Sequence, residues 1–463
     1  MTDADTIAAV ATPPGVSAVA IVRLSGPDAR AAAEACFEPA TPGPWRARRM
    51  RRGWVRDTRR GARVDDALAV LFPAPHSYTG EDVVELHVHG GAGVVASVLA
   101  LVLGSGARLA GAGEFTRRAF VNGRMDLAQA EAVADLIAAQ SSLAAKAAAA
   151  RLDGATGRRL RGLREELLSE LVAIEAHVDY PDEVGEPDAG ALAQRIRAQR
   201  DSVAGMLAGA GPARALRDGI DCVIAGPPNA GKSSLLNALL DAERAIVSDV
   251  PGTTRDVIED RVAVDGVVLR LRDTAGLRAT ADALEAEGIA RARRAIADCE
   301  MVLLVIDGSG PLGAHERAAI SATDGRPRIV ICNKADLGDA GARQAREEFA
   351  WASTDAADRA FVCGSVRDAA TIAAVRAAIA RLGWGGAAID ANTALVANAR
   401  QIEALARARE ALEHAAATID AGLPVDLLSS DLNAAVAAYG EVTGQAVTEE
   451  VLDGIFSRFC VGK

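Results

Sequence analysis

The chain has few aromatic residues and very few lysines. Of its 463 residues, 3% are aromatic and 50% are hydrophobic, so its cores must be aliphatic and rich in alanine, which suits helix bundles and parallel sheets. Every basic side chain other than histidine is an arginine except Lys146, Lys232, Lys334 and Lys463. Because a guanidinium group cannot replace an ammonium group at every site, Lys232, Lys334 and Lys463 are candidates for specific roles, and the alternative is coincidence among so few lysines.

The sequence also shows no pattern typical of a targeting segment, a membrane-spanning segment or a cysteine-based metal site. No run of about 18 uncharged apolar residues occurs, and residues 1–23 have no basic stretch leading into an apolar one. We therefore expect a cytoplasmic protein with no signal peptide and no membrane partner. The six cysteines form no C-x-x-C pair and no metal-ligand spacing, so we expect most of them in hydrophobic cores and none in a zinc site.

One basic segment contrasts with the net charge of −11, which argues against indiscriminate binding to nucleic acids. Residues 46–63 contain nine arginines and a single acidic residue, Asp57. Such a cluster can hold the phosphate groups of an RNA backbone. It can equally be the solvated face of a hairpin, and the sequence leaves both interpretations open.

The spacing of apolar residues changes along the chain. Before residue 120, short strands are predicted at 19–24, 67–72 and 83–88, with a helix near 93–103. Helical spacing follows over 121–215 and returns over 384–463. Neither helical segment can bury its apolar side alone, so we predict one bundle into which residues 216–383 are inserted. The apolar positions are Leu160, Leu163, Leu167, Leu171, Ile174 and Val178, then Ile402, Leu405, Leu412 and Ile419, then Leu428, Leu432, Val436 and Tyr439.

A phosphate-binding motif begins the inserted part. Residues 226–233 fit G-x-x-x-x-G-K-S and lie between a predicted buried strand at 222–225 and a predicted helix at 234–240. Glycines in such a loop let backbone N–H groups converge on phosphates at a helix N-terminus. Lys232 would place its charge on the β- and γ-phosphates, and the Ser233 hydroxyl would bind Mg²⁺.

Three further motifs follow in a fixed order: G-T-T-R-D at 252–256, D-T-A-G at 273–276 and N-K-A-D at 333–336. Asp273 closes a predicted strand at 267–272, where its carboxylate can hold the Mg²⁺ shell, and Gly276 can donate an N–H to the γ-phosphate. A further predicted strand, 328–332, precedes the last motif. Asp336 can accept both the N1–H and the amino group of guanine, which adenine does not match. The four motifs together predict a guanine-nucleotide switch that hydrolyses GTP.

Motifs spread over nearly the whole chain resemble one family. They are A-T-P-P-G at 11–15, A-I-V-R-L-S-G at 20–26, Y-T-G-E-D at 78–82, H-G-G at 89–91, G-E-F-T-R-R-A-F at 113–120, D-L-A-Q-A-E-A at 126–132 and C-V-G-K at 460–463. In these the sequence is similar to the tRNA-modification GTPases called MnmE or TrmE. The resemblance implies an α/β and α+β multidomain fold. It comprises an N-terminal α+β folate-binding and dimerisation domain at 1–120, a helical domain in two halves at 121–215 and 384–463, and an inserted Ras-like P-loop GTPase domain at 216–383.

The resemblance also implies an activity with its cofactors and partners. The family is a homodimeric, K⁺-stimulated GTPase of the cytoplasm that uses Mg²⁺ and forms a heterotetramer with the FAD-dependent MnmG. Together they modify C5 of the wobble uridine (position 34) of certain tRNAs to (carboxymethyl)aminomethyluridine. The one-carbon source is a tetrahydrofolate derivative, 5-formyl- or 5,10-methylene-tetrahydrofolate.

Motifs and resemblance together give the nucleotide site. The resemblance implies that Thr254 joins Ser233 in holding Mg²⁺, and that K⁺ is held by Asn229, Thr253 and the carbonyls of Ser248 and Val250. The expected GTP contacts are Asn229, Ala230, Gly231, Lys232, Ser233, Ser234, Ser248, Asp249, Val250, Pro251, Gly252, Thr253, Thr254, Asp273, Thr274, Ala275, Gly276, Asn333, Lys334, Ala335, Asp336 and Gly364.

Two positions in this site depart from common patterns. Leu277 stands where Ras-like switches have a glutamine that orients water. The resemblance assigns that role to Glu285, and the alternative is that Glu285 is a solvated surface acid. The family usually has Ser-Ala after the last strand of the nucleotide domain, whereas this chain has Cys363-Gly364. We expect Gly364 still to donate its N–H to guanine O6.

The resemblance places a folate site on Arg23, Glu81, Arg124 and Lys463, with Arg124 standing where the family often has lysine. A strand arginine paired with a core acid is the alternative for Arg23. Cys460 is a candidate nucleophile, because a thiolate beside a cation such as Lys463 could attack C6 of uridine and activate C5. Alternatively, Cys460 only packs the last helix against the N-terminal domain.

Two other functions stay open from the sequence. One is an RNA- or ribosome-assembly GTPase without covalent chemistry, and the other is a folate-binding scaffold with a vestigial GTPase. The complete set of Mg²⁺ and phosphate residues argues against the second. The N-terminal motifs and the C-terminal C-V-G-K argue against the first.

Overall fold

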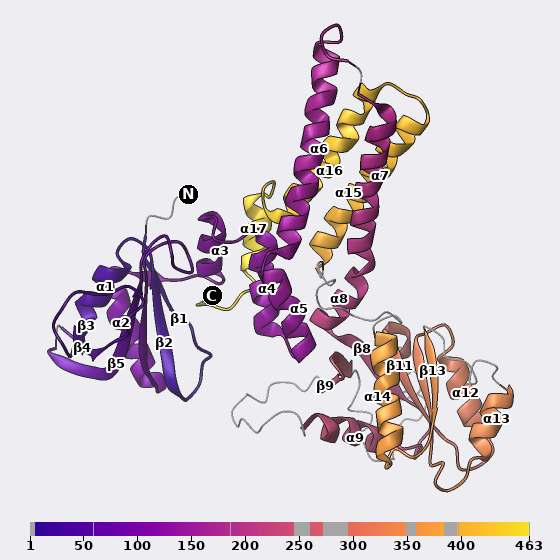
Figure 1. The fold of residues 1–463 in the computed structure, drawn as a ribbon. Coiled ribbons are helices and arrows are strands. Elements are labelled where there is room, and N and C mark those ends of the chain that lie inside the picture. Colours follow the sequence, from indigo (N-terminus) through magenta and orange to yellow (C-terminus); the bar gives the residue numbers. More distant parts are fainter. Residues whose placement is uncertain are drawn as a thin grey trace. The chain divides into compact units, whose positions relative to one another are not determined.

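A computed structural model describes residues 5–58, 60–185, 187–244, 260–271, 295–348, 358–383, 396 and 398–462. The chain forms two compact units (Figure 1). The first comprises residues 1–134, 151–173 and 433–463, and the second comprises residues 135–150 and 174–432. The domain boundaries at 120, 215 and 383 stay predictions. Within the described ranges, no helix combines the length and the apolar character needed to cross a membrane.

The first unit contains a sheet in the strand order β3-β4-β5-β6-β2-β1-β7. Neighbouring strands are antiparallel, apart from β1 and β7, which pair in parallel. Helices α1 (Ala29–Cys36) and α2 (Ala92–Leu103) pack on one face, where alternate residues such as Leu24 and Leu86 are buried. The strands are β1 (Ile7–Val10), β2 (Ser17–Ser25), β3 (Phe37–Pro39), β4 (Arg51–Asp57), β5 (Ala62–Phe72), β6 (Val83–Gly90) and β7 (Arg108–Leu109). The strands predicted at 19–24, 67–72 and 83–88 are confirmed as parts of β2, β5 and β6.

Helix α3, most of α4 and the last helix of the chain, α17, also belong to this unit. Helix α3 (Glu114–Val121) follows β7, and its Phe115 packs with residues of β1. Leu127 of α4 (Leu127–Ala138) and Phe456 of α17 (Glu449–Phe456) share a further core. Gly113 begins α3 with a φ of 62°, and a Cβ there would lie 2.7 Å from the Phe456 carbonyl oxygen. Only glycine allows this close approach, which brings α17 and the C-terminal tail against the start of α3.

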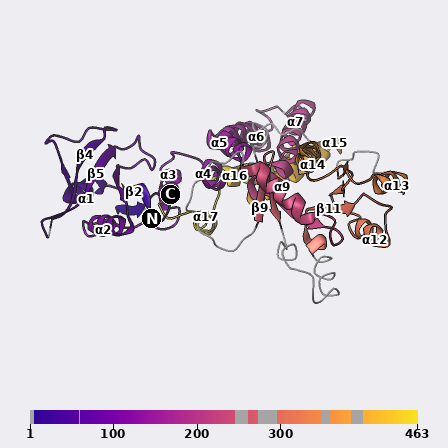
Figure 2. The same cartoon turned by 90° about the horizontal axis from the view of Figure 1, so that it is seen from below.

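The remaining helices are predominantly amphipathic. In α6 (Ala155–Asp179) the predicted side is buried from Leu160 to Ile174, but Val178 is 50% exposed and was predicted wrongly, because it lies in the last turn of the helix. Helices α7 (Ala189–Ala208) and α15 (Ala399–Asp420) lie side by side in the second unit (Figures 1 and 2). The others are α5 (Ser142–Leu152), α8 (Ala210–Asp218), the short 3-10 helix η2 (Val425–Leu427) and α16 (Leu428–Thr443).

The second unit contains a sheet in the order β13-β12-β11-β8-β10-β9, parallel except for β9. Helices α9 and α14 cover one face, and α12 and α13 cover the other (Figure 1). Since both faces are covered, the central strands are continuous apolar runs. The elements are β8 (Ile220–Ala225), α9 (Lys232–Arg244), β9 (Asp260–Val264), β10 (Val267–Leu271), β11 (Met301–Asp307), α12 (Ala314–Ala322), β12 (Arg328–Asn333), α13 (Ala340–Glu348), β13 (Arg359–Cys363) and α14 (Ala369–Gly383).

This topology sets the place of the nucleotide motifs. In the sheet, β8 lies between β10 and β11, so the strand order reverses beside β8. Ligands of open α/β sheets bind at such a reversal, beyond the carboxyl ends of the strands. The G-x-x-x-x-G-K-S loop follows β8, and N-K-A-D follows β12. Because parallel strands end at the same edge, the fold brings these two motifs together.

Candidate functional site

The phosphate-binding loop joins β8 to α9. Gly231 has a φ of 108°, and a Cβ there would lie 2.2 Å from the Asn333 side-chain nitrogen, so this position requires glycine. Asn229 is exposed and also has a positive φ, of 60°. Helix α9 begins directly at Lys232, so its N-terminal N–H groups and positive dipole end face the loop. The arrangement suits binding of a phosphate chain.

Lys232 folds back over the loop. Its Nζ donates to the carbonyl oxygens of Gly226 at 2.9 Å and Pro227 at 2.8 Å. Burial lowers the pKa of Lys232, because carbonyl dipoles replace only part of the lost hydration. An anion bound at this loop would stabilise the charged form of Lys232, which burial disfavours. This attraction is the electrostatic basis for binding the β- and γ-phosphates here. The exposed Ser233 and Ser234 side chains follow in the first turn of α9.

Asn333 joins three parts of the site. It is 3% exposed; its Nδ2 donates to the Ala230 carbonyl at 2.8 Å, and its Oδ1 accepts from the Val366 N–H at 2.9 Å. The phosphate loop, the N-K-A-D motif and the loop after β13 are therefore held in one arrangement by a single amide.

Lys334 and Asp307 form a polar pair beside this amide. Lys334 has a φ of 63°, and its Nζ lies 2.6 Å from the Asp307 carboxylate at the end of β11. Burial alone would raise the pKa of Asp307, but hydrogen bonds from Lys334 and Ser309 outweigh it, so that pKa is lowered. The pair fixes the Lys334 side chain next to the base-binding loop. Sequence analysis did not single out Asp307, although an acid at the end of the apolar run 301–306 was a usable signal.

A pocket of about 470 Å³ lies beside these residues. Asp336 is exposed and lines it, which leaves its carboxylate available to the edge of a purine. The other lining residues are Ala335, Cys363, Gly364, Ser365, Asp368, Ala370, Thr371 and Ala374. Asp336 and Gly364, both expected to contact guanine, are thus brought to one pocket.

The donor expected from Gly364 is engaged elsewhere. Its N–H donates to the Cys332 carbonyl at 3.1 Å, because the pairing of β12 with β13 continues one residue past Cys363. The next N–H, of Ser365, has no recorded acceptor in the described part of the chain. Our expectation that Gly364 presents its N–H to guanine O6 is therefore not met in this arrangement, and Ser365 offers the nearest available donor.

Gly364→Ala tests how tightly this loop is packed. A Cβ at position 364 would lie 2.1 Å from Oγ1 of the buried Thr371, so we expect the free energy of unfolding to fall by about 1–3 kcal/mol and GTP binding to weaken. The double variant Gly364→Ala/Thr371→Ala should recover most of both losses. Thermal unfolding and titration with a fluorescent GTP analogue measure them. No recovery in the double variant would contradict the steric explanation.

Several predicted site residues lie outside the described residues. They are Ser248, Asp249, Val250, Pro251, Gly252, Thr253, Thr254, Asp273, Thr274, Ala275, Gly276, Glu285 and Lys463.

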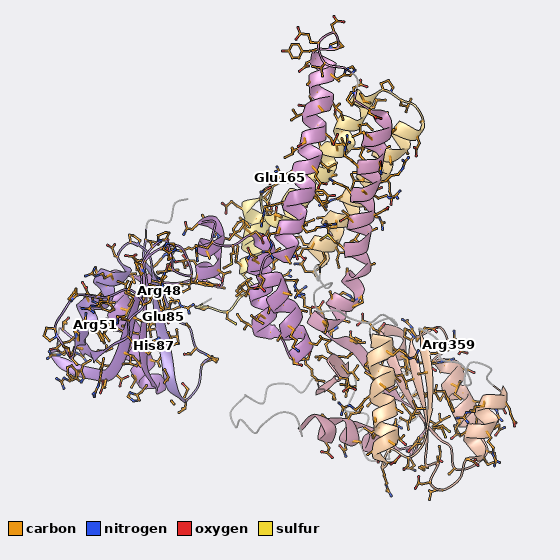
Figure 3. All side chains as sticks on the ribbon, viewed as in Figure 1. Arg48, Arg51, Glu85, His87, Glu165 and Arg359 are labelled. Carbon is orange, nitrogen blue, oxygen red and sulfur yellow. The ribbon has the colours of Figure 1, made fainter. Side chains whose placement is uncertain are left out.

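A second polar cluster lies in the first unit, around Arg23. The Arg23 Nε donates to Glu85 Oε1 at 2.9 Å across the β2–β6 pair, and one Nη donates to the Gly462 carbonyl at 3.3 Å. Its guanidinium carbon lies 5.7 Å from the ring centre of Tyr78 and 5.8 Å from that of Phe115. The alternative that Arg23 pairs with a strand acid is thus what the structure shows, and the same side chain also reaches the C-terminal tail. Figure 3 labels Glu85 and His87 on β6.

Glu81 is held from two sides. One carboxylate oxygen accepts from Ser25 Oγ at 2.7 Å, and both lie 3.2 Å from an Nη of the buried Arg118. Arg118 also donates to Asp5 and Glu114, while its buried Nε has no hydrogen-bond partner. Sequence analysis assigned Arg118 no role, although it stands four residues after Glu114 on one face of α3.

Arg124 approaches the same loop. Its Nε donates to the Ser77 carbonyl at 3.1 Å, and its Cγ would lie 3.3 Å from a Cβ at Gly80. Since Glu81 is in this loop and Tyr78 contacts Arg23, three residues of the predicted folate site converge on residues 77–81.

The C-terminal tail passes this cluster. Val461 forms a β-bridge with Ala112, and the Cys460 carbonyl accepts from the Gly113 N–H at 3.4 Å. The Cys460 side chain is exposed, whereas Phe456 and Phe459 are buried. The phenylalanines therefore pack the last helix, and the Cys460 thiol does not.

Comparison with known proteins identifies the family. A family model described as the MnmE helical domain matches residues 127–460, and one described as the GTP-binding protein TrmE N-terminus matches residues 6–124. The tRNA modification GTPase MnmE of Symbiobacterium thermophilum is 46% identical over 474 residues, with 99% of each chain covered. The chain belongs to the MnmE family. Family members from Chloroflexus aurantiacus and Moorella thermoacetica are 45% and 44% identical, covering 99% of this chain and 100% and 99% of their own.

Membership of the MnmE family makes the chain a GTPase, so the motif-based prediction of a GTP hydrolase is confirmed. Among solved structures, elongation factor SelB from Methanococcus maripaludis, in complex with the GTP analogue GppNHp, aligns with 37% of this chain and 35% of its own. The TM-score is 0.27 and the identity 16%.

Proposed function

We propose that this chain is a K⁺-stimulated GTP hydrolase that, with a FAD-dependent MnmG partner, modifies C5 of uridine 34 of certain tRNAs to (carboxymethyl)aminomethyluridine. The one-carbon unit would come from a tetrahydrofolate derivative. The observation that carries the proposal is the match to tRNA modification GTPases over 99% of the chain. The C-terminal tail of the chain lies beside the Arg23 cluster, which supports it. We further propose that it acts as a homodimer within a heterotetramer with MnmG.

The nucleotide site has the groups that GTP binding needs. Lys232 and the N–H groups at the start of α9 would bind the phosphates, and Asp336 would bind the guanine edge. Ser233, in the first turn of α9, would hold Mg²⁺, which neutralises charge on the β- and γ-phosphates when bound. Asn333 holds the phosphate-binding loop and the loop after β13 in fixed relative positions.

The Arg23 cluster fits a folate in its donor set. Arg23 and Arg124 carry positive charge that suits the carboxylates of a folate tail, and Glu81 can accept a pair of pterin N–H groups. The buried Arg118 Nε without a partner adds an unused donor next to Glu81. When bound, the folate supplies a one-carbon unit, while the residues of this chain bind and orient it.

Reconstitution tests the proposal. Full-length protein, MnmG, a tetrahydrofolate derivative, GTP and K⁺ are incubated with unmodified tRNA, and the nucleosides are then analysed by mass spectrometry. We expect a modified uridine 34 that depends on every component. If GTP is hydrolysed with no new nucleoside, the chain instead acts as an RNA- or ribosome-assembly GTPase.

Hydrolysis should be markedly faster in K⁺ than in Na⁺, and Asn229→Ala should abolish the difference. Asn229 is exposed on the phosphate-binding loop, so its amide oxygen can reach an ion beside the phosphates. A monovalent cation there supplies the positive charge that an arginine finger otherwise gives. Phosphate release is measured in matched KCl and NaCl buffers. Equal rates in the two salts for the unaltered protein would remove this part of the proposal.

A further inference from the structure

A strongly basic surface lies on β4, β5 and the loop before them, outside both sites described above. Residues 37–72 contain nine arginines against four acidic residues, whereas the whole chain has a net charge of −11. We call residues 45–66 the arginine hairpin. Figure 3 labels Arg48 and Arg51 in this part of the first unit.

The local acids neutralise only part of the hairpin's charge. Arg52 pairs with Asp66, Arg56 with Glu38 and Arg60 with Asp57. Arg59 lies outside the described residues, and the five other arginines form no ion pair with any acid among the described residues. They are Arg46, Arg48, Arg49, Arg51 and Arg63.

Some of these guanidinium groups are held in fixed orientations. Arg63 lies 4.0 Å above the ring centre of Trp54, and Arg51 lies 5.7 Å from that of Trp45. The Arg48 Nη2 donates to the His76 carbonyl at 2.8 Å, so that side chain is held by a backbone acceptor. Stacking and backbone contacts reduce the entropy lost when a guanidinium group binds an anion, because its position is already restricted.

The hairpin presents its charges on a pleated surface. Gly53 and Val55 of β4 face the core, so the alternate residues Arg52, Trp54 and Arg56 lie on the opposite face. Residues on one face of a strand repeat about every 6.6 Å. Two of these cations are paired, Arg52 with Asp66 and Arg56 with Glu38, so the excess positive charge of the surface comes from the arginines without ion pairs. A surface with several spaced cations around an aromatic ring suits an extended chain of phosphates better than a single anion.

We propose that the arginine hairpin binds the phosphate backbone of the tRNA substrate. This inference rests on the proposed function and adds to it the surface that binds the RNA. Unpaired arginines beside tryptophans match a nucleic-acid backbone, with phosphate contacts that position the RNA without reading its sequence. The hairpin belongs to the same unit as the Arg23 cluster and Cys460.

The test removes three charges that form no ion pair with an acid among the described residues. In Arg46→Gln/Arg49→Gln/Arg63→Gln, we expect the affinity for an unmodified tRNA transcript to fall about tenfold to a hundredfold at 0.1 M salt. The slope of log affinity against log salt should become shallower by about 2, since each lost phosphate contact removes about 0.7–0.9. Fluorescence anisotropy over a salt series measures both, with the full-length protein.

A matched control carries Arg30→Gln/Arg343→Gln/Arg409→Gln. These side chains are 49%, 69% and 44% exposed, each pairs with an acid four residues away, and their loss changes the net charge by the same amount. The control should bind tRNA like the unaltered protein, and both triple variants should keep GTP hydrolysis without tRNA and the melting temperature.

Two results would overturn the assignment in different ways. If the hairpin variant binds tRNA with the control's affinity and salt slope, the surface is not the tRNA site, and a parallel loss of binding to anionic phosphatidylglycerol vesicles would assign it to a membrane instead. If the unaltered protein binds no tRNA even at low salt, the hairpin assignment fails, whereas the proposed function fails only if the reconstituted reaction with MnmG yields no modified uridine.

Discussion

Asn333→Asp is expected to abolish measurable GTP binding at micromolar nucleotide. One carboxylate oxygen would keep the Val366 N–H, but the other would face the Ala230 carbonyl, to which the amide now donates at 2.8 Å. The site is 3% exposed, so the new charge would be buried without a partner. Such a charge lowers the free energy of unfolding by about 3–5 kcal/mol. It also weakens GTP binding, because the phosphate-binding loop and the loop after β13 are no longer held in one arrangement.

The chain offers a matched control at Asn398. There the side-chain oxygen accepts from the Gln401 N–H at the start of α15, and aspartate caps a helix as well as asparagine does. Asn398→Asp should therefore leave the melting temperature and GTP affinity unchanged. Calorimetry and titration with a fluorescent nucleotide compare the two variants. GTP affinity within threefold of the unaltered protein in Asn333→Asp would show that this amide does not hold the site together.

The strands of the second unit could be predicted because a local feature of the sequence identifies them. A parallel strand covered on both faces is a continuous apolar run, so the predictions at 222–225 and 328–332 are confirmed as β8 and β12. Strand β4 was not predicted. Its sequence, R-R-G-W-V-R-D, has little apolar alternation, because one of its faces is exposed and carries arginines.

The contacts of the nucleotide site could be predicted only where a local motif specifies them. The motif at 226–233 fixes its loop and the start of α9 from neighbouring residues alone. The amide of Asn333, in contrast, meets the Ala230 carbonyl across 103 positions in the sequence, and only the sheet order brings them together. The same holds for Gly364, since its N–H completes the pairing of β12 with β13 instead of remaining available to a base.

The contacts of the Arg23 cluster could likewise be predicted only in part from the sequence. Arg23 and Glu81 were assigned by resemblance, but Arg118 joins Glu81 to Asp5 and Glu114 through tertiary contacts that no local pattern predicts. The exposure of Cys460 was equally open from the sequence. It follows from the two aromatic side chains, Phe456 and Phe459, that take up the packing of the last helix.

Cys460→Ser is expected to eliminate tRNA modification while leaving K⁺-stimulated GTP hydrolysis intact. The thiolate would add to C6 of uridine, and the displaced π electrons would make C5 nucleophilic, whereas a serine hydroxyl is a far weaker nucleophile at neutral pH. Because the side chain is exposed and the tail is held through backbone contacts at Cys460, Val461 and Gly462, the substitution should not alter the fold. Nucleoside analysis of the reconstituted reaction and phosphate release measure the two activities.

Two further variants make this result specific. Glu285→Ala should lose both activities, because we assign Glu285 to positioning the water that attacks GTP and expect hydrolysis to slow about a hundredfold without it. Val461→Ala changes the next residue of the tail, which is 52% exposed, and should keep both activities, so a loss in Cys460→Ser cannot come from disturbance of the tail. If Cys460→Ser modifies tRNA normally, its thiol takes no part in the reaction. The covalent step then belongs to another nucleophile, for which MnmG is the next candidate.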